Sequence, residues 1–116
     1  MNKNKKGFIC IVDLEPVVGS EQGKRRPVLV ISETEVNELP PVVNVMPITS
    51  RKPNRMIYPN EVLLQSNYGL INESIVLCFQ IRTLDKSRLN RYLGNIQNKN
   101  YQNEIIEALK FQLGIG

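Results

Sequence analysis

Hydrophobic residues occur in short, almost continuous runs along most of the chain and in a spaced pattern only near its end. Short apolar runs that are rich in β-branched residues and bounded by Pro or Gly are typical of buried strands. Pro27 and Pro47 cannot donate to a sheet ladder, so we expect Pro27 to begin one strand and Pro47 to terminate the next. The pattern predicts strands at residues 8–14, 27–32, 42–48, 61–64 and 74–80, with shorter candidates at 56–58 and 81–84.

The final segment has the period of an amphipathic helix. Its apolar residues recur every three or four positions between Tyr101 and Leu113. Asn98 or Asn100 is expected to cap this helix, and Gly114 is expected to end it. Weaker helical turns are predicted at residues 33–37, capped by Ser32 or Thr34, and at residues 86–91, capped by Asp85.

The order of these elements indicates the class of fold. Several short strands followed by one terminal helix predict an α+β domain, built on a small, strongly curved antiparallel sheet or barrel. One domain is expected over residues 1–116, with a flexible basic tail at residues 1–6. A domain of this size leaves roughly a third of its unfolded surface exposed, so dimerisation would supplement its core. No apolar stretch is long enough to cross a membrane or to act as a secretory signal.

Composition narrows the chemistry. The chain has 15 Lys and Arg against 11 Asp and Glu, and its net charge of +4 favours an anionic partner without requiring one. It has no His, which excludes histidine-based catalysis and histidine-ligated metals. Cys10 and Cys78 each lie in an apolar run and are expected to be buried free thiols, which fits a reducing cytoplasm. No metal or cofactor is predicted.

A polar loop leads onto the second predicted strand. Residues 17–24 contain Gly19 and Gly23 and are followed directly by Arg25 and Arg26. No activating base, carboxylate pair or metal cluster is signalled by the sequence. The remaining chemistry is stabilisation of negative charge by guanidinium and hydroxyl groups. RNA suits such a site because it supplies its own nucleophile, the 2′-hydroxyl.

The candidate site residues follow from that chemistry. Arg26 would stabilise a phosphoryl transition state, Thr49 would donate to a phosphate oxygen, and Glu21 would accept the proton of the 2′-hydroxyl. Arg25 would steer the phosphate, and Gln80 would read a base edge. Each of these residues is also compatible with a solvated or strand-end position, as is the basic loop that follows Thr49, so composition leaves both interpretations open.

Four sequence blocks carry a resemblance to a known family. They are Asp-Leu-Glu-Pro at residues 13–16, Gly-Ser-Glu-Gln-Gly-Lys-Arg-Arg-Pro-Val-Leu-Val at 19–30, Pro-Ile-Thr-Ser at 47–50 and Gln-Ile-Arg-Thr-Leu-Asp-Lys-Ser-Arg-Leu at 80–89. In this order and spacing the chain resembles the MazF/PemK family of type II toxin endoribonucleases over nearly its whole length. The resemblance implies an SH3-like barrel of the CcdB/MazF-like fold.

The same resemblance implies an activity. Such a toxin cuts single-stranded RNA or mRNA at short sequence motifs without a metal, and so inhibits translation and growth. The 2′-hydroxyl attacks the adjacent phosphate, which leaves a 2′,3′-cyclic phosphate and a 5′-hydroxyl. Arg26 and Thr49 match the essential arginine and hydroxyl residue of the family, with Glu21 as the third catalytic candidate. The RNA-binding candidates are Ser20, Gln22, Lys24, Arg25, Ser50 and Gln80.

Partners and alternatives complete the expectation. The resemblance implies a cytoplasmic homodimer and a MazE-like antitoxin whose disordered C-terminal segment covers the RNA groove, with DNA contacted only through the antitoxin. Some members use a histidine in the first loop, so this chain resembles the branch that relies on Arg and Thr. One alternative is a CcdB-like gyrase inhibitor, which is disfavoured because the chain has no Trp and ends in Leu-Gly-Ile-Gly. The other is a non-catalytic barrel that binds RNA or protein.

Overall fold

The computed structural model describes residues 5–13, 25–39 and 41–116. Four predicted site residues, Ser20, Glu21, Gln22 and Lys24, lie outside these ranges. The described elements are β1 (Phe8–Asp13), β2 (Arg25–Val30), α1 (Thr34–Asn37), β3 (Val42–Ser50), β4 (Glu61–Leu64), β5 (Ser74–Leu77), β6 (Arg82–Asp85), the short 3-10 helix η1 (Lys86–Arg88), β7 (Leu89–Asn95) and α2 (Lys99–Leu113).

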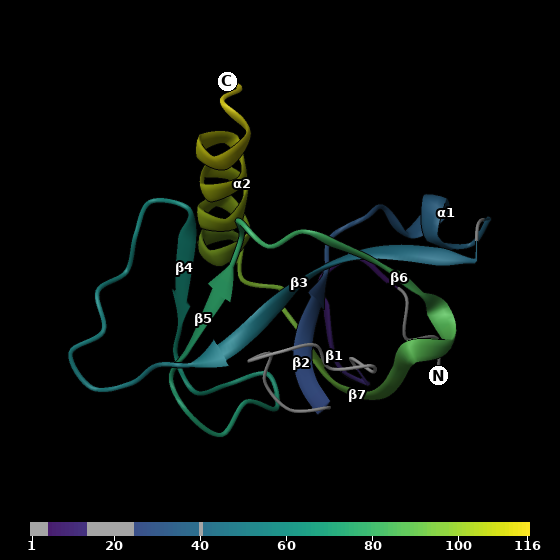
Figure 1. Ribbon diagram of the computed structural model, residues 1–116, viewed down its shortest axis with the longest axis horizontal. Helices are drawn as coiled ribbons and strands as arrows, with labels where there is room; N and C mark the ends of the chain where they lie inside the picture. Colours follow the sequence, from purple (N-terminus) through teal and green to yellow (C-terminus); the bar gives the residue numbers. More distant parts are fainter. Residues whose placement is uncertain (1–4, 14–24, 40) are drawn as a thin grey trace, which may run out of the picture.

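The seven strands form an open, strongly curved antiparallel sheet (Figure 1). The strands follow the order β4-β5-β3-β2-β1-β7, and β6 pairs with β3 beside this path. β3 is the central strand, because its first half pairs with β6 and its last three residues pair with β5. α2 packs on β4 and stands at the end of the sheet where β4 and β5 lie. The predicted α+β class is confirmed.

The central strands are buried on both faces. Ile9 of β1 packs into a core that Ile105 and Ala108 of α2 cover, whereas Cys10 and Val12 pack into a second core on the opposite face. β2 and β3 alternate between the two cores in the same way, since side chains along a strand point to opposite faces. This explains the nearly continuous apolar runs. Both cysteines are buried free thiols, as predicted.

Two glycines allow β7 to approach the loop between β4 and β5. A Cβ atom on Gly94 would fall 2.6 Å from the carbonyl oxygen of Tyr68, and one on Gly69 would fall 2.6 Å from that of Leu93. Gly69 also has a φ of +82°, which side chains rarely adopt. The backbones on the two sides can therefore meet only where side chains are missing, and this contact brings β7 close to the β4–β5 side of the sheet.

The two prolines lie inside strands, so the predictions that Pro27 begins its strand and that Pro47 ends the next are wrong. Pro27 is the third residue of β2, whose ladder with β3 starts one residue later, at Val28. Pro47 pairs with Val28 on one edge. On its other edge it falls between the β6 ladder, which ends at Val45, and the β5 ladder, which begins at Ile48. A missing N–H is tolerated at such gaps in the ladders.

β7 is the strand that the sequence pattern did not predict. The helical turn predicted over residues 86–91 extends only over Lys86–Arg88, where the Asp85 carboxylate accepts from the backbone N–H of Ser87 as expected. The chain then enters β7, whose pairing with β1 is interrupted by two register shifts. The strand predicted at residues 56–58 does not form, and that segment belongs to a loop.

Of the two α-helices, α2 follows the capping prediction and α1 does not. The side chain of Asn98 accepts from the backbone of Asn100 and Tyr101, and Gly114 ends the helix with a φ of +69°. α1 begins after Glu33 without a side-chain cap, so neither Ser32 nor Thr34 caps it as predicted. The Thr34 hydroxyl instead accepts from the backbone of Lys6, which ties the described part of the predicted tail to α1.

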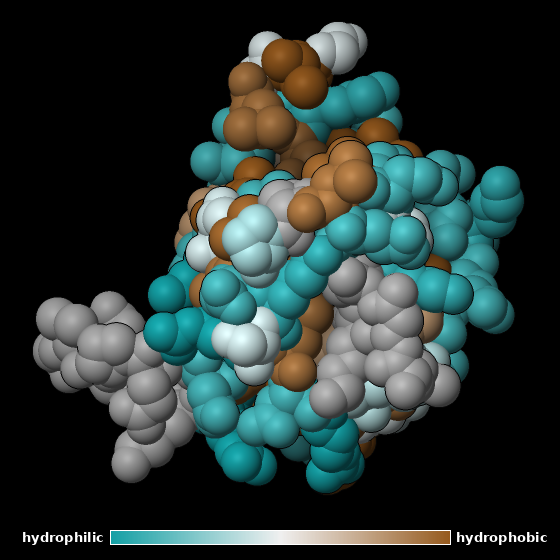
Figure 2. Space-filling view, turned by 90° about the vertical axis from the view of Figure 1, so that its right-hand side faces the viewer, coloured by the Kyte–Doolittle hydropathy of each residue, from teal (hydrophilic) through white to brown (hydrophobic). Residues whose placement is uncertain are grey.

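The C-terminal end of α2 projects from the body of the protein. Exposed apolar side chains gather there, including Phe111, Leu113 and Ile115 (Figure 2). None of the helices in the described ranges is long and apolar enough to span a membrane.

Candidate nucleic-acid interface

An open cleft of about 660 Å³ lies at the start of β2 and the end of β3. β2 contributes its first three residues, β3 contributes its last three, and β1 and β7 contribute residues beside them. The loops on both sides of β4 complete the wall, with Arg51–Pro53 on one side and Gly69–Asn72 on the other. The cleft is therefore built from five separate parts of the chain.

The structure brings the two principal candidates, Arg26 and Thr49, to this cleft. Arg26 pairs with Val12 in the β1–β2 ladder. The β2–β3 ladder pairs Val28 with Pro47 at its last rung and so brings the start of β2 near the end of β3. This pairing explains why two residues 23 positions apart line the same cleft.

The described lining of the cleft is strongly basic. It carries five cationic side chains and no Asp or Glu among the described residues. The Asp13 carboxylate lies 3.4 Å from Nε of Arg25, its register partner in β1, and Glu73 lies 3.2 Å from Nη1 of Arg51. A cleft with one sign of charge concentrates anions. The five cations are Arg25, Arg26, Arg51, Lys52 and Arg91.

Apolar residues lie between these cations. Among the apolar residues of the lining, Ile11, Pro27, Ile48 and Leu93 come from four different strands. Ile71 stands on the loop between β4 and β5, and its side chain is 91% exposed. Alternating cationic and apolar surface suits single-stranded nucleic acid, because phosphates bind the cations while base faces contact apolar groups.

The remaining predicted residues fall in different places. Arg25 and Ser50 line the cleft beside Arg26 and Thr49. Gln80 does not, because it lies exposed in the turn after β5, where its backbone N–H donates to the carbonyl of Leu77. Glu21 and its three neighbours in the first loop, Ser20, Gln22 and Lys24, lie outside the described residues. Within the described ranges, no group of three or more Cys, Asp or Glu side chains is arranged to hold a metal ion.

Sequence reasoning missed the contribution of β7. Arg91 reaches the cleft from the middle of this strand, and Leu93 lies two residues further on the same face. The available signal for a strand was the spacing of Leu89, Arg91 and Leu93 at every second position. Gly94 and the number of polar residues in this segment weakened that signal. The basic residues Arg51 and Lys52, which are compatible with a solvated loop, also line the cleft.

A basic cleft on an open, strongly curved antiparallel sheet defines a protein suited to bind a single-stranded polyanion. The model of the family described as PemK-like, MazF-like toxin of type II toxin–antitoxin system matches residues 5–113. The chain belongs to this family.

Individual relatives agree with that assignment. The chain is 38% identical to an Endoribonuclease MazF of Staphylococcus saprophyticus over 111 residues, which are 96% of this chain and 92% of the relative. Its fold resembles MazF in a MazE–MazF structure from Deinococcus radiodurans, with a TM-score of 0.77, 30% identity and 98% of both chains covered. A mycobacterial endoribonuclease in complex with its cognate antitoxin gives a TM-score of 0.78 at 25% identity, with 97% and 96% covered.

Proposed function

We propose that this chain is a metal-independent endoribonuclease that cleaves single-stranded RNA or mRNA, and that it acts as the toxin of its toxin–antitoxin pair. The observation that carries this proposal is the convergence of Arg26 and Thr49 on one basic cleft. The relative from Staphylococcus saprophyticus, which is named an endoribonuclease, supports the activity.

The chemistry assigns a role to each side chain at the centre of the cleft. The RNA 2′-hydroxyl gives up its proton and attacks the adjacent phosphorus, and the bond to the 5′-oxygen breaks. The leaving 5′-oxygen takes a proton from water, so a 2′,3′-cyclic phosphate and a 5′-hydroxyl result. The guanidinium of Arg26 stabilises the negative charge on the non-bridging oxygens, and the hydroxyl of Thr49 donates to one of them. Glu21 is proposed to accept the proton of the 2′-hydroxyl.

RNA binding extends along the cleft from this centre. Arg25 and Ser50 adjoin the two central residues. The other described cations would contact flanking phosphates, so affinity should fall as salt rises. Ser20, Gln22 and Lys24 of the first loop, together with Gln80, are proposed as further RNA contacts.

Partners follow from the solved relatives. A MazE-like antitoxin is proposed, since structures of relatives contain one. Its disordered C-terminal segment would compete with RNA for the basic cleft, and DNA would be reached only through the antitoxin. A homodimer in the cytoplasm is proposed, and the exposed apolar residues at the end of α2 are consistent with further association. One domain over residues 1–116 remains the proposed organisation.

Cleavage of a long defined RNA in the presence of EDTA tests the proposal. We expect discrete fragments with 5′-hydroxyl ends, and cleavage by Arg26→Ala that is slower by about 10²- to 10³-fold. Cleavage that requires a divalent metal, or that is as fast in Arg26→Ala as in the wild type, would overturn the mechanism. Binding of RNA without new 5′-hydroxyl ends would instead support the non-catalytic barrel, and inhibition of DNA supercoiling would support the gyrase inhibitor.

A further inference from the structure

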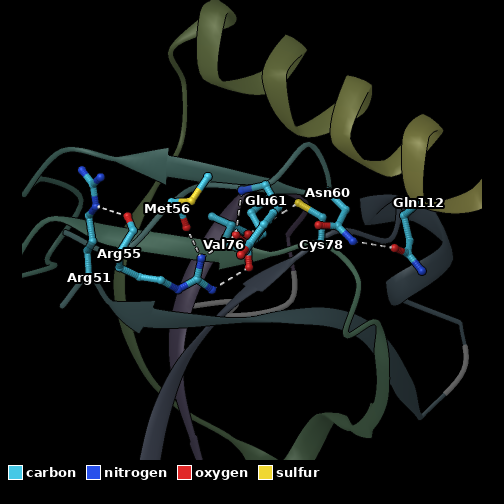
Figure 3. A network of polar contacts seen from close by, with 9 residues as sticks. Arg51, Arg55, Met56, Asn60, Glu61, Val76, Cys78 and Gln112 are labelled. Carbon is cyan, nitrogen blue, oxygen red and sulfur yellow. Dashed lines mark hydrogen bonds and ion pairs between the residues drawn. The ribbon is translucent and has the colours of Figure 1, made fainter. Parts of the chain in front are cut away.

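The loop between β3 and β4, residues 51–60, is folded around one buried carboxylate. Glu61 begins β4, and its side chain is only 2% exposed. Its two oxygens accept from both terminal nitrogens of Arg55, at 2.8 and 2.7 Å, and one of them also accepts from the backbone N–H of Tyr58 at 3.0 Å (Figure 3). A parallel pair of such bonds fixes both the distance and the orientation of the guanidinium.

Arg55 also contacts other residues of the same loop. Its side chain also donates to the carbonyl of Met56 and lies over the ring of Tyr58, 5.7 Å from the centroid. Its backbone N–H donates to the carbonyl of Lys52, which closes a turn in which Asn54 has a φ of +63°. The ion pair thus holds a turn that contains a strained residue.

Arg51, the first residue of the loop, binds the backbone of Arg55. Its Nε donates to the carbonyl oxygen of Arg55 at 3.0 Å (Figure 3). Its Nη1 donates to Glu73 at 3.2 Å. Arg51 and the adjacent Lys52 line the basic cleft, whereas neither Arg55 nor Glu61 does. A carboxylate outside the cleft therefore binds the residue, Arg55, whose backbone contacts both of these cleft residues.

We propose that the Arg55–Glu61 ion pair is a clasp that positions Arg51 and Lys52 for binding of the RNA backbone. The proposal rests on the RNA-binding role of the cleft given above. Glu61 and Arg55 are positioning residues, because they act through the loop and do not touch the substrate. Removing the clasp lets the loop move, so the two cations lose their fixed place in the cleft while Arg26 and Thr49 stay on their strands.

The surroundings of Glu61 favour its charged form. Hydrogen bonding from Arg55 is the main cause that holds the pKa of Glu61 below its ordinary value, and the bond from Tyr58 acts in the same direction. Burial opposes them. The Cys78 thiol, whose pKa is raised to about 12 by burial and by the charge of Glu61, stays protonated and does not compete for the ion pair.

Glu61→Gln tests the clasp, because it keeps the shape of the side chain and removes its charge. Trypsin cuts after Arg51 and Arg55, so its rate at these bonds reports how firmly the loop is held. We expect faster cutting there, a KM for RNA that rises about tenfold, and a kcat within about twofold of the wild type. The dissociation constant for a labelled single-stranded oligonucleotide should rise with the KM.

The matched control is Glu33→Gln. It removes a carboxylate, just before α1, that is paired with Lys6 at 2.6 Å.

A second variant tests the clasp if Glu61→Gln alone fails to fold. Glu61→Gln combined with Arg55→Gln leaves no unpaired charge, so the fold should persist without the ion pair. The same rise in KM and faster cutting after Arg51 are expected. Folded variants that match Glu33→Gln in both the tryptic rate and the KM would overturn the clasp. If the wild type does not cut RNA, the proposed nuclease activity fails, whereas the tryptic rate and the oligonucleotide affinity still decide the clasp.

Discussion

Arg26 and Arg51 reach the same cleft from two different kinds of support. Arg26 belongs to β2 and is held by its backbone pairing with Val12 in β1. Arg51 is the first residue beyond β3, and its backbone N–H donates to the carbonyl of Glu73 at 2.9 Å. Its guanidinium donates to the Glu73 carboxylate and to the carbonyl of Arg55. One cation lies within a strand, and the other stands where a strand passes into a loop that contacts its guanidinium.

The different supports of Arg26 and Arg51 suit different roles in catalysis and binding. A strand holds a side chain with little help from neighbouring side chains, which suits the group that must meet the reacting phosphate. A loop cation is placed less rigidly, which suits contact with phosphates of flanking nucleotides. Substitutions at Arg26 and Thr49 should therefore change mainly kcat, and substitutions at the loop residues Arg51 and Lys52 should change mainly KM.

The largest effect is expected at Arg26. Arg26→Ala should lower kcat by about 10²- to 10³-fold, because it removes the main charge that stabilises the transition state. Arg26→Lys is the matched variant, since it keeps the charge but loses the planar fork, and it should recover only part of the rate. Single-turnover cleavage of an RNA oligonucleotide measures both. Equal rates for Arg26→Ala and the wild type would remove the distinction between strand and loop cations.

Thr49 should follow with a smaller loss. Thr49→Val keeps the shape of the side chain and removes the hydroxyl, and kcat should fall by roughly 10- to 100-fold. Thr49→Ser keeps the hydroxyl and should stay within about fivefold of the wild type. The same single-turnover assay decides, and a change confined to KM would assign Thr49 to substrate binding.

Arg51→Gln should have a weaker effect, mainly on binding. KM should rise by roughly three- to fivefold, and the slope of log KM against log salt should fall by about 0.7, the change expected for one phosphate contact on a single strand. Titration of cleavage rates between low and moderate salt measures this. Arg82→Gln is a suitable control, because Arg82 is an exposed arginine of β6 that does not line the cleft. An unchanged salt slope would argue against phosphate contact by Arg51.

The smallest effect is an acid dependence of the loop. The pKa of Glu61 is lowered in the folded protein, so its contribution to stability is complete above the ordinary pKa of Glu and is lost as pH falls through the lowered value. The wild type should therefore unfold more readily as pH falls below about 4.5, whereas Glu61→Gln should lack this part of the dependence. Denaturant unfolding at several pH values measures the difference. A constant difference in stability between the two proteins over this range would contradict it.

The parts of the fold that were predictable had a local cause. Short β-branched runs predicted the central strands, and the spacing of apolar residues, Asn98 and Gly114 predicted the final helix and both of its ends. β7 was missed because its pairing with β1 contains irregularities and its sequence includes Gly94. The places of Pro27 and Pro47 were wrong because the gaps in their ladders arise from which strands become neighbours, and no local signal encodes that.

The site, like the fold, was predictable from the sequence only in part. The sequence by itself determined the kind of chemistry, because the absence of His and the pairing of arginines with hydroxyl residues left charge stabilisation as the available mechanism. Its resemblance to a toxin family singled out Arg26 and Thr49. Only the tertiary structure decided that Arg91 joins them and that Gln80 does not line the cleft. It also showed that Glu61, a buried carboxylate outside the cleft, pairs with Arg55 of the loop that begins at Arg51. The physical reason is that a cleft is made by strands and loops distant in sequence, whose side chains meet only when the sheet curves.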